Sequence, residues 1–379
     1  MPLGLYLHYP FCRNRCHYCD FYKTLHNEQD ESRYFAALTI ETELAAAEYG
    51  LEGRRLSSIY IGGGTPSLAD VRHLSRWIES VGQIFDYADD LEFSIESNPE
   101  SVTIEKLRGW RELGVNRPVF GVQSFNRDLL AGLGRRHSPH DSHKAIYQTG
   151  AIGYRNFGVD LIFGWPGQTT KMLSADLDHL LALQPPHISF YQLTVEPGTT
   201  LWDMVSDGSL EPPTEEPALA MYRGGSEQMI TARYERYEVS SFSRPGFACR
   251  HNLGYWLGHE YLGLGPSAHS FVAGRRFANP CDLVAYMDSL QAGNLPAQPD
   301  ESGAQERMTE AIMLGFRLAQ GISRKRFAEQ YGHSVQSRLN SEQYGLLIDG
   351  CYLIEDGDYL RLSDKGLYLA DEITRRLLA

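Results

Sequence analysis

Short β-rich runs alternate with helix-like stretches over the first two thirds of the chain, and this alternation is the strongest constraint on its fold. Six such runs occur, at residues 3–9, 57–61, 91–97, 117–122, 156–163 and 187–195. Several are apolar on both faces, as is typical of parallel strands covered by helices. An amphipathic stretch over 30–49 ends at Gly50. We therefore predict an α/β fold with an incomplete (β/α)6 barrel over residues 1–240.

The remaining third of the chain has a different character. Residues 241–292 are rich in glycine and aromatic residues, which predicts a loop-built segment packed beside the barrel. Residues 293–305 have the composition of a linker. The pattern over 305–379 is three helices and then a hairpin that turns at Asp356-Gly357. This order predicts a mostly helical, winged-helix-like C-terminal domain.

The charge balance argues against nucleic acid as a partner. The chain has a formal net charge of -13, and residues 305–379 hold 10 Lys and Arg against 11 Asp and Glu, so the basic surface that phosphates require is missing. No leader peptide and no run of 18 apolar residues is visible in the sequence. We expect a cytoplasmic protein without a transmembrane segment, which leaves peripheral membrane contact open.

Three of the six cysteines lie within eight residues, as Cys12, Cys16 and Cys19 in a C-x3-C-x2-C pattern directly after the first predicted strand. Three thiolates on a cubic four-iron cluster leave one iron open to another ligand. The alternatives are a zinc site, with His17 as a conceivable fourth ligand, or three structural thiols. The spacing favours an iron–sulfur cluster.

Polar or glycine-rich residues follow the next strands at the same end of the predicted barrel. The second strand ends in Gly62-Gly63-Gly64-Thr65-Pro66, where the absence of side chains lets a ligand approach the backbone. Later strands end near Glu96, Gln123 and Asp160. Each could be a capping or packing residue. Because ligands bind at the carboxyl ends of parallel strands, the set predicts a polar ligand cradle.

Taken together, the motifs C-x3-C-x2-C, GGGTP, E-x-N-P, GVQSF, LGRRH, DLIFGWPGQT and HNLGYW resemble the coproporphyrinogen-dehydrogenase-like branch of the radical S-adenosylmethionine (SAM) superfamily. The resemblance covers nearly the whole chain. It implies a [4Fe–4S] cluster on the three cysteines, with SAM as ligand of the open iron. The SAM-binding residues that the matching motifs imply are Tyr6, Tyr18, Gly63, Gly64, Thr65, Glu96, Gln123, Arg135 and Asp160.

Two departures separate the chain from the oxidases of this branch. Those enzymes carry a further cysteine two residues after the third, where this chain has Phe21, and they have a long N-terminal extension, whereas eleven residues precede Cys12 here. Both features resemble the HemW-type haem chaperones, as does the H-N-x-x-Y-W signature over 251–256. This resemblance implies that His251 is an axial haem ligand. His251 as a turn cap, or Cys249, His259 or His269 as the ligand, are the alternatives.

Three functions follow as expectations. The first is a haem-binding chaperone that hands haem to acceptor proteins, with respiratory proteins among the candidates. The second is an oxygen-independent coproporphyrinogen III oxidase, and the third is a radical SAM enzyme for an unrelated substrate. The sequence favours the first because of Phe21. It leaves open whether SAM is consumed and which oligomer forms.

Overall fold

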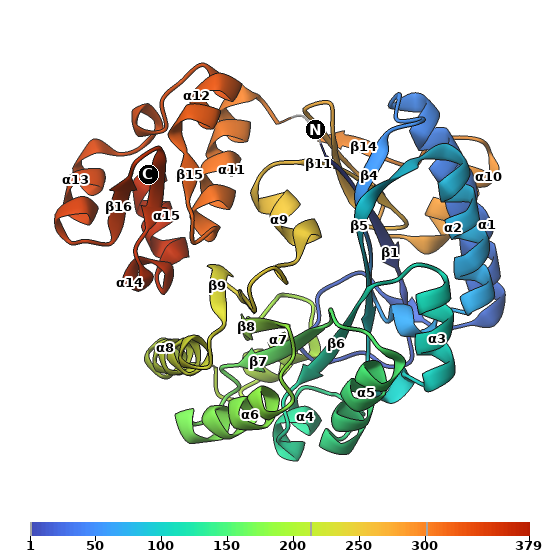
Figure 1. Ribbon diagram of the computed structural model, residues 1–379, viewed down its shortest axis with the longest axis horizontal. Coiled ribbons are helices and arrows are strands. Elements are labelled where there is room, and N and C mark those ends of the chain that lie inside the picture. Colours follow the sequence, from blue (N-terminus) through green and yellow to red (C-terminus); the bar gives the residue numbers. More distant parts are fainter. Residues whose placement is uncertain (1, 213, 301) are drawn as a thin grey trace.

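In the computed structural model, which describes residues 2–212, 214–300 and 302–379, twelve strands form one curved sheet (Figure 1). Its centre is six neighbouring parallel strands. They are β1 (Leu3–Tyr9), β4 (Arg55–Gly63), β5 (Asp86–Ser97), β6 (Arg117–Gln123), β7 (Gly158–Phe163) and β8 (His187–Gln192). This arrangement confirms the predicted fold class, an incomplete parallel barrel.

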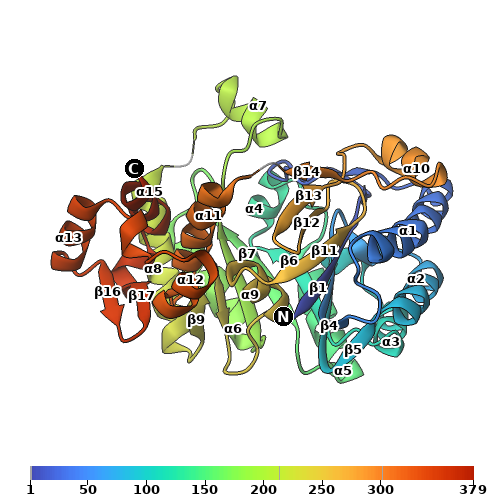
Figure 2. The ribbon, with the colours of Figure 1, turned by 90° about the horizontal axis from the view of Figure 1, so that it is seen from above.

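Helices cover the outer face of this sheet (Figure 1). Several begin at a side chain that caps the first turn, such as Asn27, Asp70, Thr103 and Ser138. Figure 2 shows α7 projecting from the body of the molecule. The helices that connect and follow the barrel strands are α1 (Glu28–Glu48), η1 (Pro66–Leu68), α2 (Val71–Ile84), η2 (Pro99–Ser101), α3 (Ile104–Glu112), α4 (Arg127–Gly132), α5 (Pro139–Ile152), α6 (Thr170–Ala182), α7 (Thr200–Ser206) and α8 (Glu215–Thr231).

The segment that follows is more regular than the sequence predicts. The sequence predicts loops over 241–292 and a linker over 293–305, but the chain after α8 supplies further strands at both edges of the sheet and two helices, and β14 lies within the predicted linker. These elements are β9 (Glu235–Glu238), β10 (Ser241–Ser243), α9 (Arg250–Trp256), β11 (Glu260–Leu264), β12 (His269–Val272), β13 (Arg275–Ala278), α10 (Leu283–Gln291) and β14 (Gln298–Asp300). Strand β11 pairs in parallel with β1. An incomplete barrel leaves β1 with unpaired backbone groups, and β11 satisfies them.

The C-terminal residues form a separate helical module with a small three-stranded sheet. Strand β16 ends at Asp356 and pairs there with Tyr359 of β17, so the predicted hairpin is present, but its turn residues are Gly357 and Asp358, one position later than predicted. The elements of the module are α11 (Ala304–Arg317), β15 (Ile322–Ser323), α12 (Arg324–Tyr331), η3 (Gln336–Arg338), α13 (Ser341–Asp349), β16 (Leu353–Asp356), β17 (Tyr359–Leu362), α14 (Asp364–Leu367) and α15 (Ala370–Leu378).

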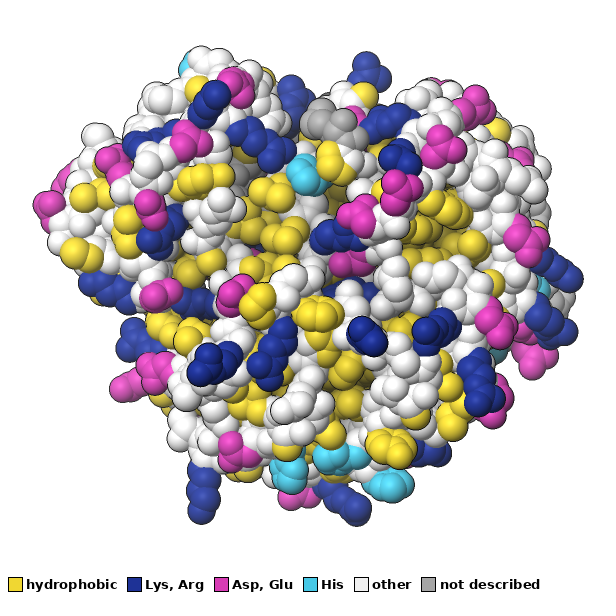
Figure 3. Space-filling model, viewed as in Figure 1, with side chains coloured by type: hydrophobic (Ala, Val, Ile, Leu, Met, Phe, Trp, Pro, Cys, Tyr) yellow, Lys and Arg dark blue, Asp and Glu magenta, His cyan; other side chains and the backbone are white. Residues whose placement is uncertain are grey.

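Two main hydrophobic cores result from this organisation. One fills the barrel and the space beneath its helices, and the other lies within the C-terminal module, around Ile312 and Phe316. The module is joined to β9 by two backbone hydrogen bonds, from Val239 to Arg317 and from Ala319 to Tyr237. On the face in Figure 3, Lys and Arg side chains are interspersed with Asp and Glu. No helix in the described residues is long and apolar enough to cross a membrane.

Candidate functional site

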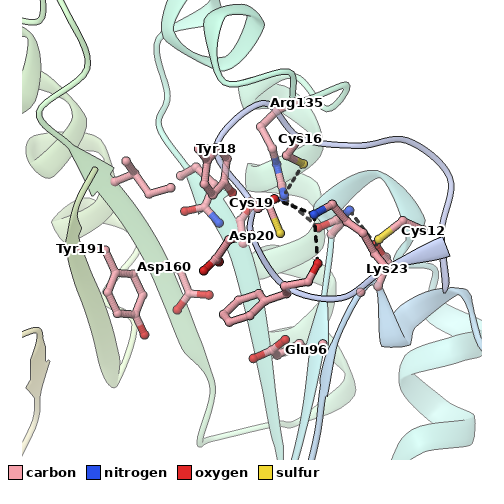
Figure 4. Close-up of a pocket in the computed structure, with 18 of the residues that line it drawn as sticks. Cys12, Cys16, Tyr18, Cys19, Asp20, Lys23, Glu96, Arg135, Asp160 and Tyr191 are labelled. Carbon is pink, nitrogen blue, oxygen red and sulfur yellow. Dashed lines mark hydrogen bonds between the residues drawn. The ribbon is translucent and has the colours of Figure 1, made fainter. Parts of the chain in front are cut away.

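The three cysteines lie in and just before a loop whose two ends are held together by a pair of short strands. Strand β2 (Phe11–Cys12) pairs with β3 (Thr24–Leu25), so residues 13–23 form the loop at the carboxyl end of β1. Cys12 is buried, Cys16 and Cys19 are half-buried, and all three are free thiols. They line one cavity of about 400 Å³, which we call the cluster cavity. Figure 4 shows them on the loop that borders it.

Contacts with the end of α4 hold this loop in place. The Nδ1 atom of His17 lies 2.8 Å from the carbonyl oxygen of Gly132, and the His17 backbone amide donates to Leu133. The Asn14 side chain donates to the carbonyl of Gly134. His17 therefore anchors the loop and is not among the residues that line the cluster cavity. In the described part of the chain, no group of three His, Cys, Asp or Glu side chains is arranged to hold a single metal ion.

The environment of the thiols suits binding to a cationic centre. The Thr65 hydroxyl donates to the sulfur of Cys12 at 3.3 Å, and Nη1 of Arg135 donates to the sulfur of Cys16 at 3.6 Å. Burial raises the pKa of Cys12 to about 11, and burial also raises the pKa of Cys19. Burial disfavours the negatively charged thiolates, and bound iron ions would offset this with their positive charge. The residues present therefore fit an iron–sulfur cluster.

Two half-buried carboxyl groups line the cluster cavity, Glu96 near the end of β5 and Asp160 in the middle of β7 (Figure 4). Burial raises the pKa of Glu96 to about 7, and the nearby Asp160 adds to this effect. Burial raises the pKa of Asp160 to about 6. The hydroxyl of Tyr60 donates to Oε1 of Glu96 at 2.8 Å. A cationic ligand would stabilise both ionised carboxylates, which fits the sulfonium and amine of SAM.

Gln123 and Arg135 complete the polar lining at the next strand. Gln123 has a positive φ of 64°, and its buried Oε1 has no hydrogen-bond partner in the described residues. An unsatisfied acceptor in a cavity wall fits a ligand that donates a hydrogen bond. Arg135 is held in place because its Nη2 donates to Oδ1 of Asn98 at 2.7 Å and to the carbonyl of Gly121 at 2.6 Å.

The glycine run after β4 lies directly beneath the cysteine loop. The amide of Gly64 donates to the carbonyl of Tyr9 at 2.7 Å, and that of Thr65 donates to Phe11 at 2.9 Å. A Cβ atom on Gly64 would lie 2.8 Å from the carbonyl oxygen of Phe11, so only glycine fits here. Gly63, Gly64 and Thr65 all line the cluster cavity, as the sequence predicts.

Nearly all the predicted SAM-site residues meet at this cavity, but Tyr6 does not line it. Tyr18 lines it with the other predicted residues, whereas Tyr6 lines a second cavity of about 540 Å³. The two cavities share Asp20 and Phe21 as lining residues. The second one, which we call the aromatic cavity, also borders Trp256 of α9 and Glu310 of the C-terminal module.

In the structure, His251 is buried and both of its ring nitrogens have hydrogen-bond partners. Its side chain is buried, Nδ1 lies 2.8 Å from the hydroxyl of Ser58, and Nε2 lies 2.7 Å from the hydroxyl of Tyr255. Its ring stacks on that of Tyr60. Burial lowers the pKa of His251 to about 3, so the ring is neutral. The predicted role as axial ligand would require one of these hydrogen bonds to break.

The alternative ligands have different surroundings. Cys249 is buried, its thiol donates to Glu92 at 3.5 Å, and burial raises its pKa to about 12. His259 lines a small separate cavity beside His251. His269 lines the aromatic cavity.

Several residues that line the cluster cavity are not predicted from the sequence, and three of them make or border key contacts. Asn98 lies within the E-x-N-P motif and pairs with Arg135, so its motif position was a usable signal. Lys23 donates to the carbonyls of Cys19 and Phe21 and so fixes the end of the cysteine loop. Tyr191 lies near the carboxyl end of β8, the strand that pairs with β7, which carries Asp160.

Comparison with known proteins agrees with this site. Residues 6–180 match the radical SAM superfamily, and residues 304–369 match the HemN C-terminal domain. The chain is 35% identical to the haem chaperone HemW of Bacillus subtilis, over 97% of each chain. It is 37% identical to the haem chaperone HemW of Mycobacterium tuberculosis, over 100% of this chain and 95% of the relative.

A solved structure shares the fold of the whole chain. Coproporphyrinogen III oxidase (HemN) from Escherichia coli superposes with a TM-score of 0.86 at 22% identity, over 100% of this chain and 90% of the other. The sequence identity to the two HemW relatives, 35% and 37%, is higher than the identity to this oxidase. The chain therefore belongs to the radical SAM superfamily and, within it, to the HemW family.

Proposed function

We propose that this chain is a haem chaperone, which holds a [4Fe–4S] cluster on Cys12, Cys16 and Cys19 and delivers haem to acceptor proteins in the cytoplasm. The observation that carries the proposal is the aromatic cavity beside the cysteine loop. Cavities of this volume, with aromatic walls and a few polar groups, are typical of sites for small organic ligands. The HemW relatives are themselves named haem chaperones.

The chain's own residues supply the SAM site in this proposal. The carboxylates of Glu96 and Asp160 would balance the positive charge of the ligand, and Oε1 of Gln123 would accept a hydrogen bond from it. Gly63 and Gly64 would let the ligand reach the backbone. Such a cluster, when bound, can supply an electron to SAM.

Phe21 favours the chaperone over the oxidase. Its side chain is 62% exposed and borders both cavities. It stands where the oxidases resembled by this sequence carry a further cysteine. Phe21 places an apolar ring there, which suits contact with a macrocycle and offers no thiol.

The test is an anaerobic comparison of haem binding with decarboxylation. Reconstituted full-length protein is titrated with haem and, separately, incubated with coproporphyrinogen III, SAM and a reductant. We expect near-stoichiometric haem binding, seen as a shifted Soret band, and no release of CO2. Robust SAM-dependent CO2 release without specific haem binding would replace this proposal with the oxidase.

A further inference from the structure

The aromatic cavity has the walls that a flat, largely apolar ligand requires. Its lining includes Phe21, Tyr22, Trp256 and Tyr261, and its volume is about 540 Å³. The buried indole Nε1 of Trp256 has no hydrogen-bond partner in the described residues. Aromatic rings stack on planar conjugated ligands and bury a large apolar area. The cavity lies between the β11–β13 edge of the sheet and α11 of the C-terminal module, which contributes Glu310 and Leu314.

A histidine nitrogen with a free lone pair is a common axial ligand of haem iron, and two histidines line the cavity. His8 is already occupied, because its Nδ1 lies 3.2 Å from the hydroxyl of Tyr6 and its Nε2 lies 2.8 Å from the carbonyl of Tyr22. His269 is exposed, and its ring makes no hydrogen bond or ion pair with any described residue. His251 of the sequence signature has both nitrogens engaged and does not line the cavity.

The backbone around His269 is held firmly in place. It opens strand β12 and pairs with Ala278 of β13. A Cβ atom on Gly263 would lie 2.0 Å from the carbonyl oxygen of His269, so this close approach requires glycine. The preceding turn is tied to α1, because the amide of Gly265 donates to Oε2 of Glu41 at 2.8 Å. A ligand on a fixed strand keeps its geometry when the metal binds.

Two of the residues that line the cavity, Arg276 and Glu310, form an ion pair. Nε of Arg276 donates to Oε2 of Glu310 at 2.9 Å, and its Nη2 lies 2.7 Å from Oε1. Nη1 of Arg276 donates to the hydroxyl of Tyr261 at 3.1 Å. These contacts link β13 of the sheet to α11 of the C-terminal module, so both parts of the chain form the wall of the cavity.

We propose that the aromatic cavity is the haem site and that the imidazole of His269 is the axial ligand of the haem iron. The proposal rests on the proposed chaperone function and assigns its site. Because Asp20 and Phe21 line both cavities, the bound haem would lie against the outer side of the cysteine loop. Haem and cluster would then share one wall, formed by that loop.

The test uses full-length, cluster-reconstituted protein titrated with ferric haem under anaerobic conditions. In His269→Ala we expect loss of the shifted Soret band and its return on addition of free imidazole, which replaces the missing nitrogen. His251→Gln should keep an imidazole-type spectrum. His333→Ala is the matched control, because His333 is an exposed histidine outside both cavities, and its spectrum should equal that of the unmodified protein.

Each outcome separates this proposal from the function on which it rests. If the unmodified protein binds no haem, both the chaperone function and this site fail. If it binds haem and His269→Ala has the same spectrum, the function stands and His269 is overturned. Loss of the imidazole spectrum in His251→Gln but not in His269→Ala would assign the ligand to the signature histidine instead. Equal iron and sulfide contents in all variants establish that the cluster is intact.

Discussion

Each cysteine of the loop has a different neighbour. Cys12 accepts a hydrogen bond from Thr65 and Cys16 accepts one from Arg135, while Lys23 binds the backbone of Cys19. Two of these contacts come from distant parts of the chain, and the third comes from the end of the cysteine loop itself. They explain how three thiols, which the sequence only places close together, are directed toward one cavity.

Replacing Cys12, Cys16 or Cys19 by Ala should abolish cluster binding, because two thiolates cannot hold a cube that three protein ligands support. Unmodified protein should bind about four irons per chain after anaerobic reconstitution. Iron and sulfide analysis with the visible absorption spectrum provides the measurement. Cys351→Ala is the control, because this exposed thiol lies outside both cavities. Stoichiometric zinc with no iron would contradict the assignment.

The half-buried carboxyl groups of the cluster cavity lead to a second prediction. Glu96→Gln and Asp160→Asn should each weaken SAM binding by about 1.5 to 3 kcal/mol, because each removes a charge-assisted contact. The iron content should not change. Calorimetric titration of the reconstituted variants with SAM measures the effect. Loss of the cluster in these variants would instead assign a structural role to the carboxyl groups.

The same groups give this affinity a pH dependence. Burial raises the pKa of Glu96 to about 7 and that of Asp160 to about 6, so the folded, ligand-free chain binds more protons than the unfolded chain. Their contribution to stability is therefore present at low pH and is lost as pH rises through these values. A cation favours the ionised forms, so SAM affinity should increase between about pH 5.5 and about pH 8. A flat profile would exclude this linkage.

At the scale of elements, helix α9 depends on one buried side chain of β5. Oε1 of Glu92 accepts hydrogen bonds from the thiol of Cys249 and from the amide of His251 at 2.9 Å, and Oε2 accepts one from the amide of Arg250 at 3.0 Å. The signature helix is thereby fixed to the barrel. His251 of this helix then contacts Ser58 and Tyr60 of β4.

Glu92→Ala should lower the free energy of unfolding by about 1 to 3 kcal/mol, because it leaves buried amide groups without acceptors. Urea denaturation followed by circular dichroism measures this change. Glu43→Ala is a suitable control, since Glu43 is an exposed residue of α1, and its effect should stay within about 0.5 kcal/mol. Equal effects of the two substitutions would refute the anchoring role.

At the scale of the whole molecule, the two hydrophobic cores are built from different parts of the chain, one from residues 3–290 and the other from residues 308–377. All five tryptophans lie between residues 77 and 256, so their fluorescence reports mainly on the barrel, with Trp256 also in contact with Arg317 of α11. The C-terminal core contributes helices without tryptophan. The two parts meet at the β9–α11 contact and at the aromatic cavity.

Ile312→Ala should destabilise the C-terminal module by about 2 to 5 kcal/mol, because Ile312 is fully buried in its core. Circular dichroism should lose part of the helical signal at lower urea concentrations, while the tryptophan transition and the iron content stay unchanged. Coincident shifts of both transitions would mean that the two cores unfold as one cooperative unit.

The six parallel strands, the cysteine loop, the C-terminal hairpin and the cysteines, glycines and polar residues at the centre of the cluster cavity could be predicted from the sequence. These features depend on local patterns, because alternating runs form strands and strand ends collect at one edge of the sheet. Neighbouring positions in one motif therefore stay neighbours in space. Asn98 could have been included on the same grounds.

The structure of the glycine- and aromatic-rich residues 241–292 depends on contacts with distant parts of the chain. Strand β11 pairs with β1, from more than 250 residues earlier in the chain, and no local pattern specifies such a partner. That pairing, with β12 beside it, brings His269 to the aromatic cavity, while Ser58 and Tyr255 occupy the nitrogens of His251. The bond from Tyr255 is local to α9, but the bond between His251 and Ser58 joins residues far apart in the chain and forms only when α9 packs against β4.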